Sequence, residues 1–331
     1  MNVKRIEWVD IAKAICAFFV ILHHLETNTQ LLSKYYMPFF LNGFLFLSGY
    51  IYKQQDFKTF INKKFFSLIV PWFFFGLLII ITGNIYSPSP EAHNGLFIDM
   101  LCFFAQIREL NDAMWFVAAL FISYIPFYFI IKYTNSKRKK THFLVFVFLV
   151  AIYCLEIIYE SSSICFPWGN NKLPWHIEYI PNALLFMYFG YIYRNEIEQK
   201  YKNSTLLTLL ILLVYVILVN IFENYYMIIL QIMIELYSVV LLVQISKIIS
   251  PNMIIQIIGQ NSLIYFGIAH YLNVPAQMLI STFFPAIYAV ILSNQYYSAI
   301  FSLVFSVISC LILLLPAKII NDYFPFVLGK H

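Results

Sequence analysis

Long apolar segments recur along the whole chain, and they constrain its fold more than any other feature of the sequence. Runs of about 17 to 22 residues alternate with polar stretches, and a helix of that length crosses the hydrocarbon core of a bilayer. Hydrophobic residues make up 61% of the 331 positions and charged residues 11%, whereas soluble domains carry about 25% charged residues. The sequence therefore predicts an all-α, polytopic integral membrane protein with about ten transmembrane helices. The predicted spans are residues 9–26, 37–53, 66–84, 114–132, 143–160, 178–194, 205–222, 225–246, 262–281 and 298–318.

The distribution of basic residues predicts the orientation of these spans. With an internal N-terminus and ten crossings, all of the 21 Lys and Arg residues except Lys34, Arg108 and Lys172 fall on the inner side. Cytoplasmic loops carry the excess of Lys and Arg in membrane proteins, so both termini are predicted to be cytoplasmic. The same topology explains the net charge of +5, and a nucleic-acid partner is not expected. We expect one transmembrane domain over residues 1–331.

The first apolar run, "DIAKAICAFFVILHH", carries ionisable residues that are costly in a membrane. At about 100° per residue, Lys13 and His24 share one helical face and lie about 16 Å apart along it, and Asp10 lies on the same face. Asp10 can pair with Lys13, whereas His23 points about 100° away from His24. Neutral imidazole is a general base suited to neutral pH. A histidine that bonds a neighbouring helix is the alternative for His24.

Further segments follow the first run in a fixed order, and together they resemble a known family. The chain is similar to the membrane-bound acyltransferase 3 family, and in particular to its fucose 4-O-acetylase-like branch. In that branch the first helix carries a basic residue, ten intervening residues and a histidine, a spacing that Lys13 and His24 match. The resemblance covers nearly the whole chain. The other matching segments are "FLFLSGY", "LIVPWFFFG", "MWFVAALF", "IPNALLFMYFGYIY" and "GQNSLIYFGIAHY".

The resemblance implies transfer of an acyl group from cytoplasmic acetyl-CoA, or another short acyl-CoA, without a metal. The acceptor would be a hydroxyl of a cell-surface glycan, such as an exopolysaccharide, or of its lipid-linked precursor. His24 would be the catalytic base or a transient acyl carrier, assisted by Asp10. Lys13, Lys63 and Lys64 would contact the donor, although many relatives have an Arg-x-x-Arg element where this chain has the two adjacent lysines. The implied location is the bacterial cytoplasmic (inner) membrane, in contact with its lipids. The sequence leaves open whether the protein forms a homo-oligomer.

Other polar and aromatic residues are candidates for binding the acceptor. Glu235 can bind a sugar hydroxyl or form an interhelical hydrogen bond, and His270 is expected to have a structural or acceptor-side role. Trp115 can stack on a sugar ring or simply mark the membrane interface, and Asn182 can support the site or cap a helix. The acids of the outer loops can bind acceptor hydroxyls, but they are predicted to be solvated loop charges: Glu160, Glu178 and Asp112.

Two other classes of protein compete with the enzyme. A transporter or flippase of a lipid-linked glycan or small anion could use His24, Glu235 and His270 as a proton relay. The chain shows no inverted repeat and no matched pair of broken helices, which disfavours that class. A structural assembly partner would leave the face shared by Lys13 and His24 unexplained.

Overall fold

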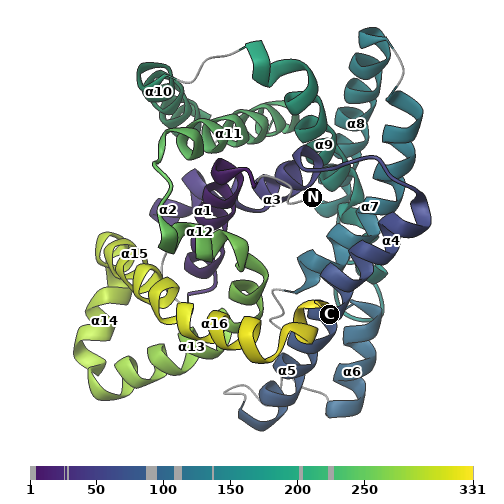
Figure 1. The fold of residues 1–331 in the computed structure, drawn as a ribbon. Helices are drawn as coiled ribbons and strands as arrows, with labels where there is room; N and C mark the ends of the chain where they lie inside the picture. Colours follow the sequence, from purple (N-terminus) through teal and green to yellow (C-terminus); the bar gives the residue numbers. More distant parts are fainter. Residues whose placement is uncertain are drawn as a thin grey trace. The chain divides into compact units, whose positions relative to one another are not determined.

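The computed structural model is helical, with no strand among the residues that it describes (Figure 1). These residues are 5–25, 27, 30–86, 95–107, 114–135, 138–200, 204–222 and 227–330, without the side chains of residues 83–86 and 270. The chain divides into two compact units. Unit 1 comprises Met1–Leu47 and Arg194–Ile319, and unit 2 comprises Ser48–Tyr193 and Ile320–His331.

Unit 1 is organised around its first helix, α1 (Glu7–His23), which packs against α11, α12, α13 and α15. Small residues allow this close packing: a Cβ at Gly259 would overlap the backbone carbonyl of Asp10, and one at Gly43 would overlap the Cys16 side chain. The other helices of unit 1 are α2 (Gln30–Tyr36), α10 (Thr205–Phe222), α11 (Ile228–Ile248), α12 (Met253–Gln260), α13 (Ser262–Phe283), α14 (Pro285–Ser293) and α15 (Gln295–Ile312). The short turns η4 (Tyr193–Ile197) and η5 (Glu198–Lys200) precede α10.

Unit 2 contains a bundle in which α7 and α8 both pack against α9. A Cβ at Gly49 would overlap the backbone of Met187, so glycine is needed where the end of α3 meets α9. The elements of unit 2 are α4 (Phe57–Lys64), the π-helical turn η1 (Phe65–Ile69), α5 (Val70–Tyr86), α6 (Leu96–Ala105), α7 (Trp115–Thr134), α8 (Lys139–Glu160), the 3-10 turn η3 (Pro174–Tyr179), α9 (Ile180–Ile192) and the C-terminal turn η6 (Pro325–Leu328). The helices α3 (Phe40–Tyr50) and α16 (Leu314–Tyr323) run from one unit into the other.

Six helical segments in the described part of the chain are long and apolar enough to cross a membrane. Two further helical pieces, Ser262–Ala269 and Tyr271–Phe283, form a bent pair with an angle of 42° between them and make a seventh candidate. The prediction of ten spans with cytoplasmic termini stays a prediction. The six segments are Phe57–Thr82, Trp115–Thr134, Lys139–Glu160, Thr205–Phe222, Ile228–Ile248 and Gln295–Tyr323.

Three of the predicted spans form helices that are shorter than the bilayer core. They correspond to α1 with 17 residues, α3 with 11 and α9 with 13. At 1.5 Å per residue these helices measure about 26, 17 and 20 Å, against about 30 Å of hydrocarbon. Most of their side chains are buried within the protein. Because lipid does not surround them, their ends need not reach the membrane surfaces.

The long helices present apolar side chains outward. On α8, Phe143 and Phe148 are 67% and 63% exposed, and on α10, Leu206 is 68% exposed. Such surfaces are stable against lipid and unstable against water. The fold is therefore that of a multi-pass membrane protein.

Candidate active site

The N-terminal part of α1 contains a buried carboxylate with two identified donors. The side chain of Asp10 is only 6% exposed, and its Oδ2 lies 2.9 Å from Nε of Arg5. Nε2 of Gln260, the last residue of α12, donates to the same oxygen over 3.3 Å. A carboxylate is stable in apolar surroundings only when such donors replace its lost hydration. Arg5 and Gln260 are thus part of this site, and the sequence analysis did not assign them to it.

The cationic side chains near Asp10 differ in their access to solvent. The side chain of Arg5 is 61% exposed, and Lys13, one turn further along α1, is half-buried. The ion pair uses Nε of Arg5, so the terminal nitrogens of the guanidinium remain as further donors. The start of α1 therefore presents positive charge that is anchored by a buried acid.

The two histidines at the other end of α1 have different surroundings. His24 is the C-terminal cap of the helix, its backbone N–H donates to the Val20 carbonyl over 3.2 Å, and its imidazole is exposed. Nδ1 of His23 lies 3.3 Å from the hydroxyl of Tyr36, and its ring packs on Phe40 with centroids 5.3 Å apart. Both side chains are exposed, and the two imidazole rings contact each other edge to face with centroids 5.5 Å apart.

Two further candidates lie on helices that pack against α1. Glu235 in α11 is 8% exposed, and its Oε1 accepts a hydrogen bond from Nε2 of Gln231 over 3.0 Å. This contact lies within one helix, and the two roles expected for Glu235 stay predictions. His270 lies between the two pieces of the bent α13, and its side chain is outside the described part of the structure.

The two adjacent lysines at the end of α4 point to different partners in unit 2. Lys63 is exposed, and its Nζ donates to Oε1 of Gln55 over 2.8 Å. Nζ of Lys64 lies 4.0 Å from the ring centroid of Tyr124, a distance at which a cation is attracted to the face of an aromatic ring. Lys63 is therefore the more accessible of the two cations.

Trp115 and Asn182 lie in unit 2, at the beginnings of α7 and α9. The Trp115 ring centroid is 4.9 Å from that of His176 in η3. The backbone N–H of Asn182 donates over 2.7 Å to Oε2 of Glu156, which is buried in α8. Oδ1 of Asn182 is also buried, and it has no hydrogen-bond partner among the described residues. Glu156 therefore caps the first turn of α9, and Asn182 itself retains an unused acceptor.

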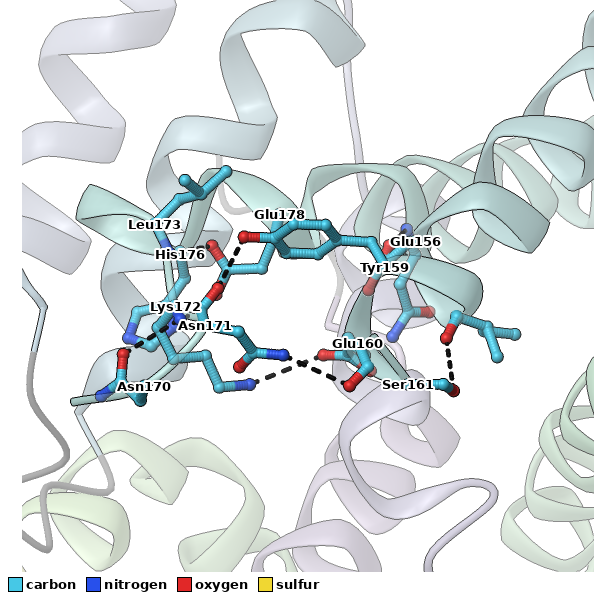
Figure 2. A network of polar contacts seen from close by, with 12 residues as sticks. Glu156, Tyr159, Glu160, Ser161, Asn170, Asn171, Lys172, Leu173, His176 and Glu178 are labelled. Carbon is cyan, nitrogen blue, oxygen red and sulfur yellow. Dashed lines mark hydrogen bonds and ion pairs between the residues drawn. The ribbon is translucent and has the colours of Figure 1, made fainter. Parts of the chain in front are cut away.

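A polar network connects η3 with the end of α8 (Figure 2). Oε1 of Glu178 lies 3.1 Å from Nδ1 of His176, and Oε2 accepts the backbone N–H of Leu173 over 2.9 Å. The Glu178 side chain is 3% exposed, so the prediction that it is a solvated loop charge was wrong. For Glu160 the prediction was correct, because its side chain is 42% exposed. Asp112 lies outside the described residues.

The pair formed by His176 and Glu178 was not predicted from the sequence. The signal available in "LPWHIEY" was a histidine two residues before a glutamate in a segment rich in aromatic and apolar residues. Its burial depends on contacts between η3 and α7, which a local pattern does not reveal.

The predicted site residues divide between the two units, and the structure describes each group within its own unit. Asp10, Lys13, His24, Glu235 and His270 belong to unit 1, whereas Lys63, Lys64, Trp115 and Asn182 belong to unit 2. No group of three or more His, Cys, Asp or Glu side chains that could hold a metal ion occurs in the described part of the chain.

The long apolar helices place the protein in the class of multi-pass membrane proteins. Its largely buried first helix carries ionisable groups. A model of the acyltransferase 3 family, described as an acyltransferase domain, matches residues 6–315. No curated protein and no solved structure matches the chain. Because the match spans nearly the whole chain, the protein belongs to the acyltransferase 3 family and is a membrane acyltransferase. This confirms the resemblance at the level of the family, and the fucose 4-O-acetylase-like branch stays a prediction.

Proposed function

We propose that this acyltransferase moves an acetyl group, or another short acyl group, from cytoplasmic acyl-CoA to a hydroxyl of a cell-surface glycan or its lipid-linked precursor. The arrangement of α1 is the observation that carries the proposal. Its N-terminal part holds cations around the buried Asp10, and its other end presents the imidazole of His24. The enzyme would lie in the bacterial cytoplasmic membrane with both termini inside.

The cationic end of α1 suits the donor, since CoA carries phosphate groups that Lys and Arg bind well. Arg5 and Lys13 lie near the predicted cytoplasmic end of α1, and Asp10 holds the Arg5 guanidinium by an ion pair. Lys63 of unit 2 remains a separate candidate for contact with the donor, since its side chain is exposed. Lys64 contributes less, because its ammonium already contacts the Tyr124 ring.

The exposed imidazole of His24 suits the chemical step. In direct transfer, His24 accepts the proton of the acceptor hydroxyl while the oxygen attacks the thioester carbonyl. The new C–O ester bond forms, the C–S bond breaks, and CoA leaves as a thiolate that takes up a proton. In the two-step alternative, a ring nitrogen of His24 first takes the acyl group with release of CoA, and the acceptor hydroxyl then takes it from the imidazole. Both routes need an accessible ring, and the side chains of His23 and His24 are both exposed. His24 is the better candidate because it shares a helical face with Lys13.

Membership of the acyltransferase family favours this enzyme over the transporter, flippase and assembly-partner alternatives. The remaining polar candidates would serve the acceptor side. These are Trp115, Asn182, Glu235 and His270.

The test compares His24→Ala with His23→Ala, a matched control one residue away. Purified wild type and both variants would be incubated in detergent with radiolabelled acetyl-CoA, with hydrolysis measured alone and transfer measured to a glycan fraction. CoA binding would be measured in parallel. We expect His24→Ala to bind CoA like wild type and to lose about 10² to 10⁴-fold in rate, the usual contribution of a general base. His23→Ala should keep the rate within a few-fold and lose some thermal stability, because its bond to Tyr36 is lost.

Equal rates for His24→Ala and wild type would show that His24 does not take part in the chemical step. If wild type binds no acyl-CoA, the donor assignment is wrong, and uptake of a lipid-linked glycan becomes the assay to perform.

A further inference from the structure

The segment from Leu173 to Asn182 in unit 2 holds a buried acid and base pair that the proposed chemistry at α1 does not use. His176 is 5% exposed and Glu178 is 7% exposed. An ionised carboxylate only accepts hydrogen bonds, so Nδ1 of His176 carries the hydrogen that points to Oε1 of Glu178, 3.1 Å away. In the neutral ring Nε2 is then an acceptor. No partner for Nε2 lies among the residues that the structure describes.

The backbone at this point is strained. Trp175 and His176 have φ angles of 59° and 51°, in the left-handed region that non-glycine residues rarely adopt. Two such residues in succession cost free energy, and strain of this kind is concentrated at functional sites. The bond from the Leu173 N–H to Glu178 and the Trp115 ring against His176 hold the strained turn in place. The turn is thereby fixed with two adjacent side chains, an indole and an imidazole, in defined positions.

Unsatisfied polar atoms and aromatic rings lie on the helices that contact this turn. Oδ1 of Asn182 is a buried acceptor and Nε1 of Trp72 a buried donor, and neither has a hydrogen-bond partner in the described part of the chain. The Trp72 ring lies 5.2 Å from that of Trp175, and the Trp115 ring lies 4.9 Å from that of His176. Aromatic walls with a few fixed donors and acceptors are typical of small-molecule sites. A buried polar atom without a partner calls for an explanation, and a bound ligand supplies one.

The charged side chains around the turn restrict the net charge of a ligand that could bind there. Glu156 and Glu178 are both buried acids, and Lys172, the nearest cation in the polar network, pairs with Glu160 instead. An anionic ligand would be repelled by two carboxylates. A ligand rich in hydroxyl groups can donate to Nε2 of His176 and to Oδ1 of Asn182. The same ligand can accept from Nε1 of Trp72 and cover an indole with its apolar face.

We propose that this cluster of Trp72, Trp115, Trp175, His176 and Asn182, oriented by Glu178, binds one uncharged pyranose ring of the acceptor. The inference rests on the proposed function, since it names the acceptor site of that reaction. The cluster lies near the start of α7 and the end of α8, and the basic residues Lys132 and Lys139 lie at the opposite ends of these two helices. By the charge rule this is the external end, where a surface glycan would be met.

The test uses the full chain in detergent and measures binding by tryptophan fluorescence. Three of the five tryptophans belong to the cluster, so a bound sugar should change the emission. The probes are methyl pyranosides of glucose, galactose, mannose and N-acetylglucosamine, with methyl glucuronide as the charged comparison. We expect at least one neutral pyranoside to bind wild type, and the glucuronide to bind at least tenfold more weakly.

Glu178→Gln should weaken that binding at least tenfold. An amide has a single acceptor atom, so it cannot serve both the Leu173 N–H and the Nδ1–H of His176. Glu160→Gln is the matched control, because this exposed acid belongs to the same network without touching the cluster, and it should bind like wild type. Trp115→Leu removes an aromatic face and leaves the acid and base pair intact, so it supplies a second variant if Glu178→Gln does not fold.

The donor half-reaction separates this inference from the proposed function. Hydrolysis of acetyl-CoA without acceptor should be equal in wild type and the control Glu160→Gln, and the KM for the glycan acceptor should rise in Glu178→Gln relative to both. If wild type binds no neutral pyranoside, or if Glu178→Gln and Trp115→Leu bind it like Glu160→Gln, the inference is overturned. If wild type binds the sugar but does not turn over acetyl-CoA, the sugar site stands and the donor assignment fails.

Discussion

Replacing Gly259 with alanine should loosen the packing of α1 and reduce activity. The added Cβ would overlap the backbone carbonyl of Asp10, and a backbone atom cannot rotate away as a side chain can. Overpacking of this kind lowers the free energy of unfolding by about 1 to 3 kcal/mol, whereas the higher helix propensity of alanine raises it by up to about 1 kcal/mol. Since only a shift of the whole helix relieves the contact, we expect a net loss of about 2 kcal/mol.

The magnitude can be checked by thermal unfolding. For a unit of this size each kcal/mol lowers Tm by about 2 to 4 °C, so Gly259→Ala should lower it by about 4 to 8 °C. Cys16 is fully buried in α1, so its reaction with a fluorogenic thiol reagent reports when this helix opens. The other four cysteines, Cys102, Cys154, Cys165 and Cys310, would be changed to serine so that Cys16 alone is labelled. Activity should fall as well, because a shift of about 1 Å in a reacting group can cost 10²-fold.

Met253→Ala is the control, since this residue lies on the same helix and is 77% exposed. Its Tm should stay close to that of wild type. The reasoning is refuted if Gly259→Ala is as stable as Met253→Ala, or more stable, because helix propensity alone predicts that alanine stabilises α12.

Three further changes test separate contacts by the same measurement of Tm. Glu156→Ala leaves the buried Asn182 N–H without its acceptor and should cost about 1 to 3 kcal/mol, while Glu156→Gln keeps an acceptor and should cost less. Asn294→Ala removes the side chain that caps α15 and should cost about 1 kcal/mol, and Asn294→Asp should restore it. Lys247→Met, Glu198→Gln and the double variant should show a coupling of about 1 to 3 kcal/mol across the 2.7 Å ion pair, and additive losses would contradict it.

The helical fold and the membrane class follow directly from composition and hydrophobic periodicity. Long apolar segments such as 143–160 and 205–222 correspond to α8 and α10, whose outward side chains are apolar. The lengths of the shorter helices could not be predicted from composition and hydrophobic periodicity. A sequence run such as 178–194 looks continuous, but η3 occupies its first residues and α9 begins only at Ile180. Tertiary packing decides such boundaries, because a helix buried among other helices need not span the bilayer.

The candidate residues of α1 were identified from spacing alone, since a helix fixes which side chains share a face. The partner of Asp10 could not be identified in that way. The structure identifies Arg5 from before the helix and Gln260 from another helix as partners of Asp10, and the pairing with Lys13 stays a prediction. The contact with Gln260 depends on how α12 approaches α1, which Gly259 makes possible.

The sequence by itself determined that this is a helical membrane acyltransferase with a basic residue and a histidine on its first helix. Apolar length, charge asymmetry and ordered motifs are properties of the chain that need no partner in space. Only the tertiary structure decided that Glu178 is buried against His176 and that the two histidines of α1 differ in their surroundings. Burial and hydrogen bonding depend on which elements come together, and a charged residue in a loop carries no local sign of what will cover it.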